Sequence, residues 1–193
     1  KLDQQPAATL KLSWKEFEAL LKWSIERAKP EKAPPPPADY IVTASRYTGT
    51  LRDDGAELSM HVTVNVLKER GWKRIPLLPS SVALTETQFQ PAEGVYLHSN
   101  GSQYELLTEK TGAIEATLSF SVAVEEQAGI QRVSFPRVAA GSSRLELTLA
   151  RADVDVKVAG AQSMRSEPGE NETTKIVAAI PAGPPVTVSW ERA

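Results

Sequence analysis

The sequence predicts an all-β protein, an antiparallel β-sandwich preceded by one amphipathic helix. The first observation is a change of hydrophobic period. Up to residue 29 apolar side chains recur every three or four residues, as in a helix, and from Tyr40 onward they alternate with polar ones, as in a strand. The second observation is that short alternating runs separated by turn residues continue to the end of the chain. This succession is typical of a sandwich or barrel and not of a βαβ sheet.

The third observation is that two segments 58 residues apart share one pattern. The runs MHVTVNV (60–66) and LSFSVAV (118–124) have the same apolar phase, and a five-residue loop ending in Gly71 or Gly129 follows each. We interpret each segment as a β-hairpin whose glycine adopts a positive φ where the loop ends. Either duplication of one segment or independent convergence on a favourable hairpin sequence explains the likeness. Both explanations are compatible with a sandwich that contains two facing hairpins.

A single helix is predicted over residues 13–29. Ser13 and Glu16 form a capping box, and Pro30 ends the helix. Its apolar stripe consists of Trp14, Phe17, Leu20, Leu21, Ile25 and Ala28. Such a stripe usually packs on a core of its own protein, but Trp23 lies off its centre, which keeps a partner-binding role open.

The prolines at 34–37 form a stiff spacer between the helix and the rest of the chain. The expected organisation is a helical arm (1–29), a Pro-rich linker (30–38) and a β-sandwich region (39–193), in which 39–110 and 111–193 could be two similar halves.

Strands are expected between clear turn signals. Asp53-Asp54-Gly55 and Asn100-Gly101 predict tight turns, and residues 167–171 predict a polar loop. The prolines at 76, 79, 136 and 181 fall at strand ends, as expected of edge strands. The expected strands are 40–51, 56–68, 72–78, 81–85, 94–99, 102–108, 113–125, 130–136, 143–150, 153–159, 174–180 and 185–190.

Composition excludes several classes of protein. A net charge of −2 without a run of basic residues argues against nucleic-acid binding. The absence of cysteine excludes disulfides, thiolate metal sites and cysteine nucleophiles. No apolar run approaches the ~20 residues that span a bilayer. Because the chain begins with Lys1 and has no signal-peptide pattern, we expect a processed protein or a piece of a longer one.

Catalytic and metal-binding patterns are weak throughout. A site built on His61 and His98 would need the two to be adjacent with a carboxylate, and solvated strand positions are the simpler interpretation. The acidic pairs, which fall on turns or exposed strand positions, are Asp53/Asp54, Glu125/Glu126 and Asp153/Asp155. No nucleophile elbow, phosphate loop or zinc-protease motif is present. We therefore expect no enzymatic activity, no metal and no cofactor.

Aromatic residues remain as candidates for binding. Exposed on one sheet face, they would stack on sugar rings; buried, they are core residues. The candidates for carbohydrate contact are Trp72, Tyr96, Tyr104 and Trp190, and those for partner contact on the helix are Trp14, Phe17, Leu21 and Trp23.

Several strand segments carry a resemblance. They are GW (71–72), IPLLP (75–79), VAL (82–84), LSFSVAV (118–124), SRLELTL (143–149) and PPVTVSW (184–190). Over roughly residues 40–190 the chain resembles uncharacterised β-sandwich segments of bacterial envelope proteins. The resemblance implies a location outside the cytoplasmic membrane, as part of a longer, membrane-associated protein, and no functional residues. The expected function is a non-enzymatic module for protein–protein contact, and the alternative is a carbohydrate-binding module.

Overall fold

The structure, a computed structural model, describes residues 12–27, 34–182 and 185–192. It divides into two units, Lys1–Pro35 and Pro36–Ala193. The first contains helix α1 (Trp14–Arg27), and the predicted last turn with Pro30 lies outside the described residues. The capping box is confirmed, since the carboxylate of Glu16 accepts hydrogen bonds from the backbone N–H (2.9 Å) and the hydroxyl (2.7 Å) of Ser13. These bonds, the backbone one foremost, lower the pKa of Glu16.

The second unit is built from β strands. In chain order they are β1 (Tyr40–Leu51), β2 (Ala56–Val66), β3 (Lys73–Pro79), β4 (Ala83–Gln90), β5 (Val95–Ser99), β6 (Gln103–Thr108), β7 (Gly112–Val122), β8 (Glu125–Gln127), β9 (Ile130–Phe135), β10 (Ser142–Leu149), β11 (Val154–Val158), β12 (Ser163–Pro168), β13 (Thr174–Ala179) and β14 (Val186–Arg192).

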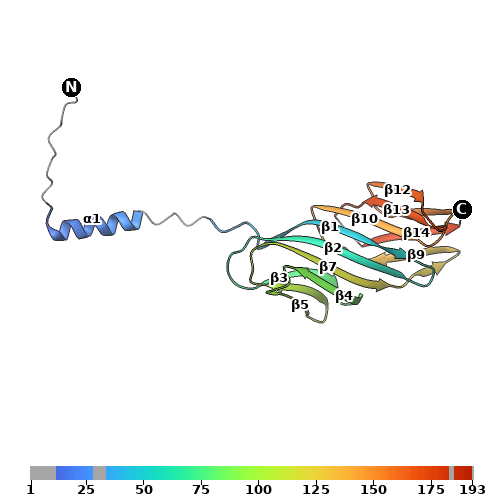
Figure 1. Ribbon diagram of the computed structural model, residues 1–193, viewed down its shortest axis with the longest axis horizontal. Helices are drawn as coiled ribbons and strands as arrows, with labels where there is room; N and C mark the ends of the chain where they lie inside the picture. The colour runs from blue at the N-terminus through green and yellow to red at the C-terminus, as the bar shows by residue number, and fades with distance from the viewer. Residues whose placement is uncertain (1–11, 28–33, 183–184, 193) are drawn as a thin grey trace, which may run out of the picture. The chain divides into compact units, whose positions relative to one another are not determined.

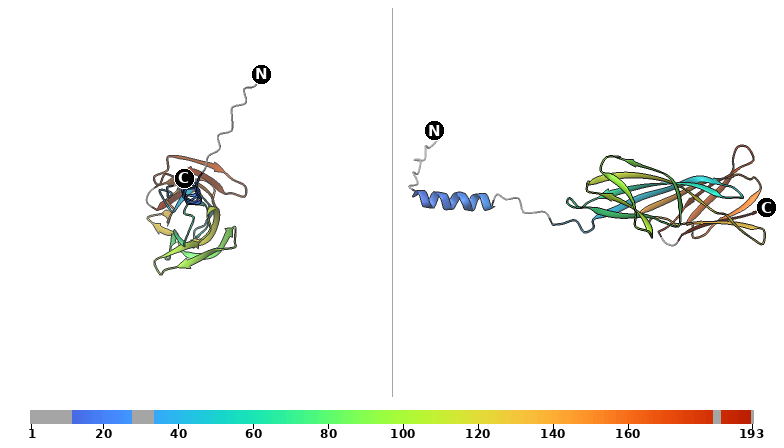
Figure 2. Two further views of the ribbon diagram at one scale, coloured as in Figure 1. Left: turned by 90° about the vertical axis from the view of Figure 1, so that its left-hand side faces the viewer. Right: turned by 90° about the horizontal axis from the view of Figure 1, so that it is seen from below.

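These strands form three sheets (Figures 1 and 2). A seven-stranded sheet has the order β12-β13-β10-β1-β2-β7-β4, a four-stranded sheet the order β11-β14-β9-β8, and a three-stranded sheet the order β3-β6-β5. All described pairs are antiparallel except β1 and β10, which run parallel from Ala44/Ser142 to Leu51/Leu149. The mostly-β, antiparallel class is therefore confirmed, but a purely antiparallel sheet is wrong at this one pair.

One hydrophobic core serves all three sheets. Tyr47 of β1 illustrates this, because its ring contacts that of Phe135 of β9 with centroids 5.7 Å apart. Its hydroxyl also accepts a 2.8 Å hydrogen bond from the backbone N–H of Val138. The three-stranded sheet contributes Ile75 and Leu106 to the same core. The seven-stranded sheet thus packs its inner face against two smaller sheets, as expected of sheets that each bury one face.

The two segments with the shared pattern are not hairpins. β2 and β7 lie side by side in the seven-stranded sheet, with Met60 opposite Leu118. After β2 the chain enters the three-stranded sheet as β3, and after β7 it enters the four-stranded sheet as β8, which pairs with β9. The first segment therefore crosses between sheets at its loop, whereas the second crosses before its loop, and Gly129 lies in the β8–β9 turn. The expected positive φ of the loop glycines is confirmed, with 79° at Gly71 and 80° at Gly129.

Turns were predicted better than polar strands. The turn at Asp53-Asp54-Gly55 joins β1 to β2, and Asn100-Gly101 joins β5 to β6. However, β12 occupies 163–168, where no strand was expected and where the last two residues belong to the predicted polar loop 167–171, and β4 extends to Gln90, beyond the expected 81–85. Every β12 residue is exposed, so this edge strand has no apolar alternation by which the sequence could reveal it.

Candidate functional site

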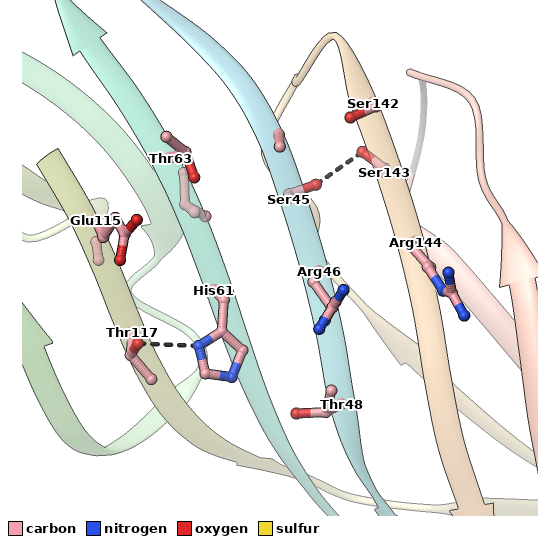
Figure 3. Close-up of a pocket in the computed structure, with 13 residues that line it drawn as sticks. Ser45, Arg46, Thr48, His61, Thr63, Glu115, Thr117, Ser142, Ser143 and Arg144 are labelled. Atoms are coloured by element: carbon pink, nitrogen blue, oxygen red, sulfur yellow. Dashed lines mark hydrogen bonds between the residues drawn. The ribbon is translucent and has the colours of Figure 1, made fainter. Parts of the chain in front are cut away.

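An open groove of about 630 Å³ crosses the outer face of the seven-stranded sheet (Figure 3). Strands β10, β1, β2 and β7 provide its walls and floor. The side chains that alternate outward into it are Ala44, Arg46, Thr48, His61, Thr63, Glu115, Thr117, Ser142 and Arg144. The groove is therefore lined by hydroxyl, guanidinium, imidazole and carboxylate groups, on the face opposite the hydrophobic core.

One row of side chains crosses the middle of the groove in strict register. Arg144 pairs with Arg46, Arg46 with His61, and His61 with Thr117. The two arginines share one acidic partner, Glu146, whose Oε1 lies 2.6 Å from Nε of Arg144 and 3.7 Å from Nε of Arg46. Two positive charges thus face one negative charge at this end of the groove.

His61 is held in place by a hydrogen bond between its Nδ1 and Oγ1 of Thr117, at 3.0 Å. Figure 3 shows the other ring nitrogen turned away from Thr117, toward the β1 side of the groove. Beneath this row, on the inward side of the sheet, the hydroxyls of Ser45 and Ser143 lie 2.7 Å apart and join β1 to β10. The bond to Thr117 fixes the His61 ring on the outer face, and the serine bond ties together the two strands that carry the arginines.

Two further hollows continue this groove along the strands. The first hollow, of about 360 Å³, shares Thr48 with the groove. The other hollow, of about 370 Å³, shares Glu57 and Ser121 with the first hollow. Hydroxyl side chains, Ser59 among them, line this extension. The outer face therefore offers an elongated polar surface that follows the direction of β2 and β7.

The predicted carbohydrate residues separate into an exposed pair and two core residues. Trp72 and Tyr96 are each 56% exposed, and their ring centroids lie 6.1 Å apart at an interplanar angle of 46°. Tyr104 packs against the hydrophobic core, and Trp190 is buried in it. Only the first two share an exposed surface, on the outer side of the three-stranded sheet.

Beside this aromatic pair, Glu105 is only 5% exposed although it alternates outward from β6. Its Oε1 accepts hydrogen bonds from Nδ2 of Asn100 (2.9 Å) and Nε2 of Gln103 (2.8 Å). The amide oxygen of Asn100 in turn accepts from the backbone N–H groups of Ser102 and Gln103. The carboxylate thus holds the β5–β6 turn, which is a structural role.

Within its own unit helix α1 buries none of its residues, including those of the apolar stripe that the structure describes. Trp14 is 77% exposed, and its ring contacts that of Phe17 at 5.8 Å. Trp23 carries the guanidinium of Arg27 over its ring at 4.4 Å. The exposed apolar residues of the helix are Trp14, Phe17, Leu20, Leu21, Trp23 and Ile25.

The structure does not bring the two histidines together, and the acidic pairs lie on exposed positions. His61 lies on β2 and His98 on β5, in different sheets. In residues 12–27, 34–182 and 185–192, no group of three or more His, Asp or Glu side chains could hold a metal ion. Of the acidic pairs, Asp53/Asp54 lies in the β1–β2 turn and Glu125/Glu126 on the short strand β8, all of them exposed. No helix among the described residues is long and apolar enough to cross a membrane.

Comparisons with known proteins bear on the fold alone. No protein-family model and no curated protein sequence matches this chain. Among solved structures, an M1 zinc metallopeptidase from Deinococcus radiodurans is similar, with a TM-score of 0.56 and 10% identity over 78% of this chain and 42% of that one. Native yeast LTA4 hydrolase is also similar, with a TM-score of 0.51 and 11% identity over 87% of this chain and 32% of that one.

This chain therefore spans less than half the length of the solved proteins that it resembles. At such low identity the likeness is one of β architecture. A similar fold occurs there as part of longer proteins.

The sequence did not indicate the arginine pair of the groove. Arg46 and Arg144 are 98 positions apart, and only the parallel pairing of β1 with β10 brings them together. The available signal was that both sit on the polar phase of an alternating strand, which is common to most exposed charges. His61 was interpreted as a solvated strand residue, but its hydrogen bond to Thr117 depends on the β2–β7 register.

Proposed function

We propose that this chain is a non-enzymatic binding module of a bacterial envelope protein, and that helix α1 is its contact with a protein partner. One observation carries this proposal: a capped, 14-residue helix leaves all its large apolar side chains exposed within its own unit. Trp14, Phe17 and Leu21 follow the i, i+3, i+7 spacing by which helices insert into apolar grooves. The partner is accordingly a protein with an apolar groove that accepts about two helical turns.

The test places a photoreactive amino acid at Phe17 or, as a control, at Glu18 in cells that produce the full-length protein. We expect one identified partner to be cross-linked from position 17 and not from position 18. Cross-links from position 17 only to residues 34–192 of the same chain would contradict the proposal.

Affinity then provides a quantitative check with the purified, identified partner. Removing an anchor buried at an interface costs more than about 1 kcal/mol, so Trp14→Ala with Phe17→Ala is expected to weaken binding at least about 30-fold. The matched control, Lys15→Ala with Lys22→Ala, changes the polar face of α1 and should leave affinity within about threefold.

The location outside the cytoplasm is part of the same proposal and is supported by the sequence resemblance. A phosphatase that folds only outside the cytoplasm, fused after Ala193 in the full-length protein, is expected to be active. An inactive fusion, together with an active cytoplasmic reporter at the same position, would contradict this location.

A second candidate function, carbohydrate binding, is favoured by the exposed pair Trp72 and Tyr96. Aromatic faces bind sugar rings by stacking. Because the two rings are inclined by 46°, they suit a chain whose successive sugar units turn and not a flat one. Retarded migration in native gels containing soluble polysaccharides tests this, with Trp72→Ala abolishing retardation and Met164→Ala, an exposed control on β12, leaving it unchanged.

A further inference from the structure

The arginine pair of the groove departs from the usual rule for neighbouring strands. Like charges directly opposite each other on paired strands are destabilising, yet Arg46 and Arg144 are partners in the β1–β10 ladder. Glu146 offsets only one of the two charges. A local arrangement that opposes stability is expected chiefly where function requires it.

The geometry leaves the arginines able to bind a further group. Both guanidiniums approach Glu146 through Nε, and their terminal nitrogens make no hydrogen bond within the described part of the chain. Each side chain is 58% exposed. Next to them along the strands stand the small residues Ala44 and Ser142, which pair with each other and leave room above the sheet. An oxyanion in this space could accept hydrogen bonds from both guanidiniums, the strongest kind available to it.

The remaining lining indicates what the anion belongs to. The hollow continues past Thr48 toward Ser59 and Ser121, so an extended ligand fits it better than a free ion. No Trp, Tyr or Phe side chain alternates outward among the described lining residues, which leaves no stacking surface for sugar rings. Hydroxyl groups, which both donate and accept, match peptide groups along a polypeptide.

We propose that this groove binds an extended acidic peptide segment, one of whose carboxylates is held by Arg46 and Arg144. His61, with its Nδ1 already bonded to Thr117, presents its second ring nitrogen as another hydrogen-bonding group. Glu115 lies two strands from Arg46 and two residues along β7 from Thr117, which strand geometry places about 12 Å from Arg46. It therefore repels a second carboxylate there, so the acidic residues of the ligand are spaced and not continuous along the groove.

The experiment follows the Nε–Hε resonances of arginine by NMR in the full chain. The probes are a peptide with glutamate at every third position, the same peptide with glutamine, inorganic phosphate and oligogalacturonate. We expect saturable shifts of the Arg46 and Arg144 resonances with the glutamate peptide and weaker binding of the other three.

Variants that are expected to change peptide affinity in opposite directions make the test specific. Arg46→Gln or Arg144→Gln should weaken peptide binding about tenfold or more, since each removes a charge-assisted hydrogen bond. Glu146→Gln removes the competing carboxylate and should strengthen it, while Arg165→Gln on the edge strand β12 serves as the unchanged control. Circular dichroism verifies that each variant is folded.

Three outcomes would overturn the proposal. These are equal binding of the glutamate and glutamine peptides, equal binding by Arg144→Gln and Arg165→Gln, and tighter binding of oligogalacturonate or phosphate than of the peptide. None of these outcomes bears on helix α1 or on Trp72. This inference can therefore fail while the proposed function stands, and the proposed function can fail while this inference stands.

Discussion

The two faces of the seven-stranded sheet are made by the same strands, yet they differ in burial and in polarity. On β7 the inward residues Leu118 and Phe120 are buried, whereas Ser119 between them reaches Ser59 across the outer face at 3.3 Å. Successive side chains of a strand point to opposite sides, so a shift of one residue separates the core from the groove. The inner face thus carries the stability of the fold, and the outer face is free to carry charges that contribute little to it.

The largest expected difference between the faces comes from Phe120→Ala. Phe120 is 1% exposed, so its removal leaves a cavity and should lower the free energy of unfolding by about 3–5 kcal/mol. Its neighbour, Ser119→Ala, should change it by about 1 kcal/mol or less. Urea unfolding followed by circular dichroism measures both, and similar losses would show that the two faces are not as unlike as their burial indicates.

The next largest difference is a loss of stability at alkaline pH that comes from a buried residue of the inner face. Burial raises the pKa of Tyr47 to about 12 from the ordinary value of 10, partly opposed by the hydrogen bond from Val138. The unfolded chain therefore loses this proton first, and stability is complete below pH 10 and is lost as the pH rises through 12, by on the order of 2–3 kcal/mol. Unfolding curves at several pH values should show this loss in the native protein.

The matched variant for this prediction is Tyr47→Phe. It is less stable at neutral pH because the Val138 N–H loses its acceptor, but its stability should fall less between pH 10 and 12. An identical alkaline decline in both proteins would contradict the assignment to Tyr47.

A smaller loss of stability is expected when a side chain is added on the inner face at a position that lies against the backbone of the next strand. A Cβ added at Gly49 would stand 2.2 Å from the carbonyl oxygen of Glu57 and 2.9 Å from Cδ2 of Leu58. Gly49→Ala should therefore cost about 1–3 kcal/mol through shifts of β1 and β2. Gly55→Ala, whose Cβ would meet nothing closer than 3.7 Å, is the control and should be nearly neutral.

The smallest expected effect belongs to the outer face. Arg46→Gln removes an exposed ion pair and also a like-charge repulsion, so stability should change by less than about 0.5 kcal/mol. Thermal unfolding measures it. A loss comparable to that of Phe120→Ala would show that the arginine pair is structural, and the binding proposed for the groove would then need another explanation.

Much of the architecture could be read from local patterns. The capping box of α1, the turns at residues 53–55 and 100–101 and the positive φ of Gly71 and Gly129 each depend on a few neighbouring residues. β12 was missed because an exposed edge strand needs no apolar side chains. The expected hairpins were wrong because alternation reports which face a residue occupies and not which strand it pairs with.

The candidate sites depended more on long-range pairing. Sequence reasoning named Trp72 and Tyr96 together with Tyr104 and Trp190, since all four are aromatic and near strands. Only the tertiary structure shows that the first two share a surface while Trp190 is buried in the core. Exposure of a large aromatic ring depends on what covers it, and the covering residues come from elsewhere in the chain.

By itself the sequence determined that this protein is mostly β with one N-terminal amphipathic helix, because periods of 2 and 3.6 are properties of neighbouring residues. The tertiary structure decided the division into three sheets, the parallel pairing of β1 with β10 and hence the meeting of Arg46 with Arg144. The physical reason is that strand pairing across about a hundred residues depends on which apolar faces bury one another in a common core, and no local pattern records that choice.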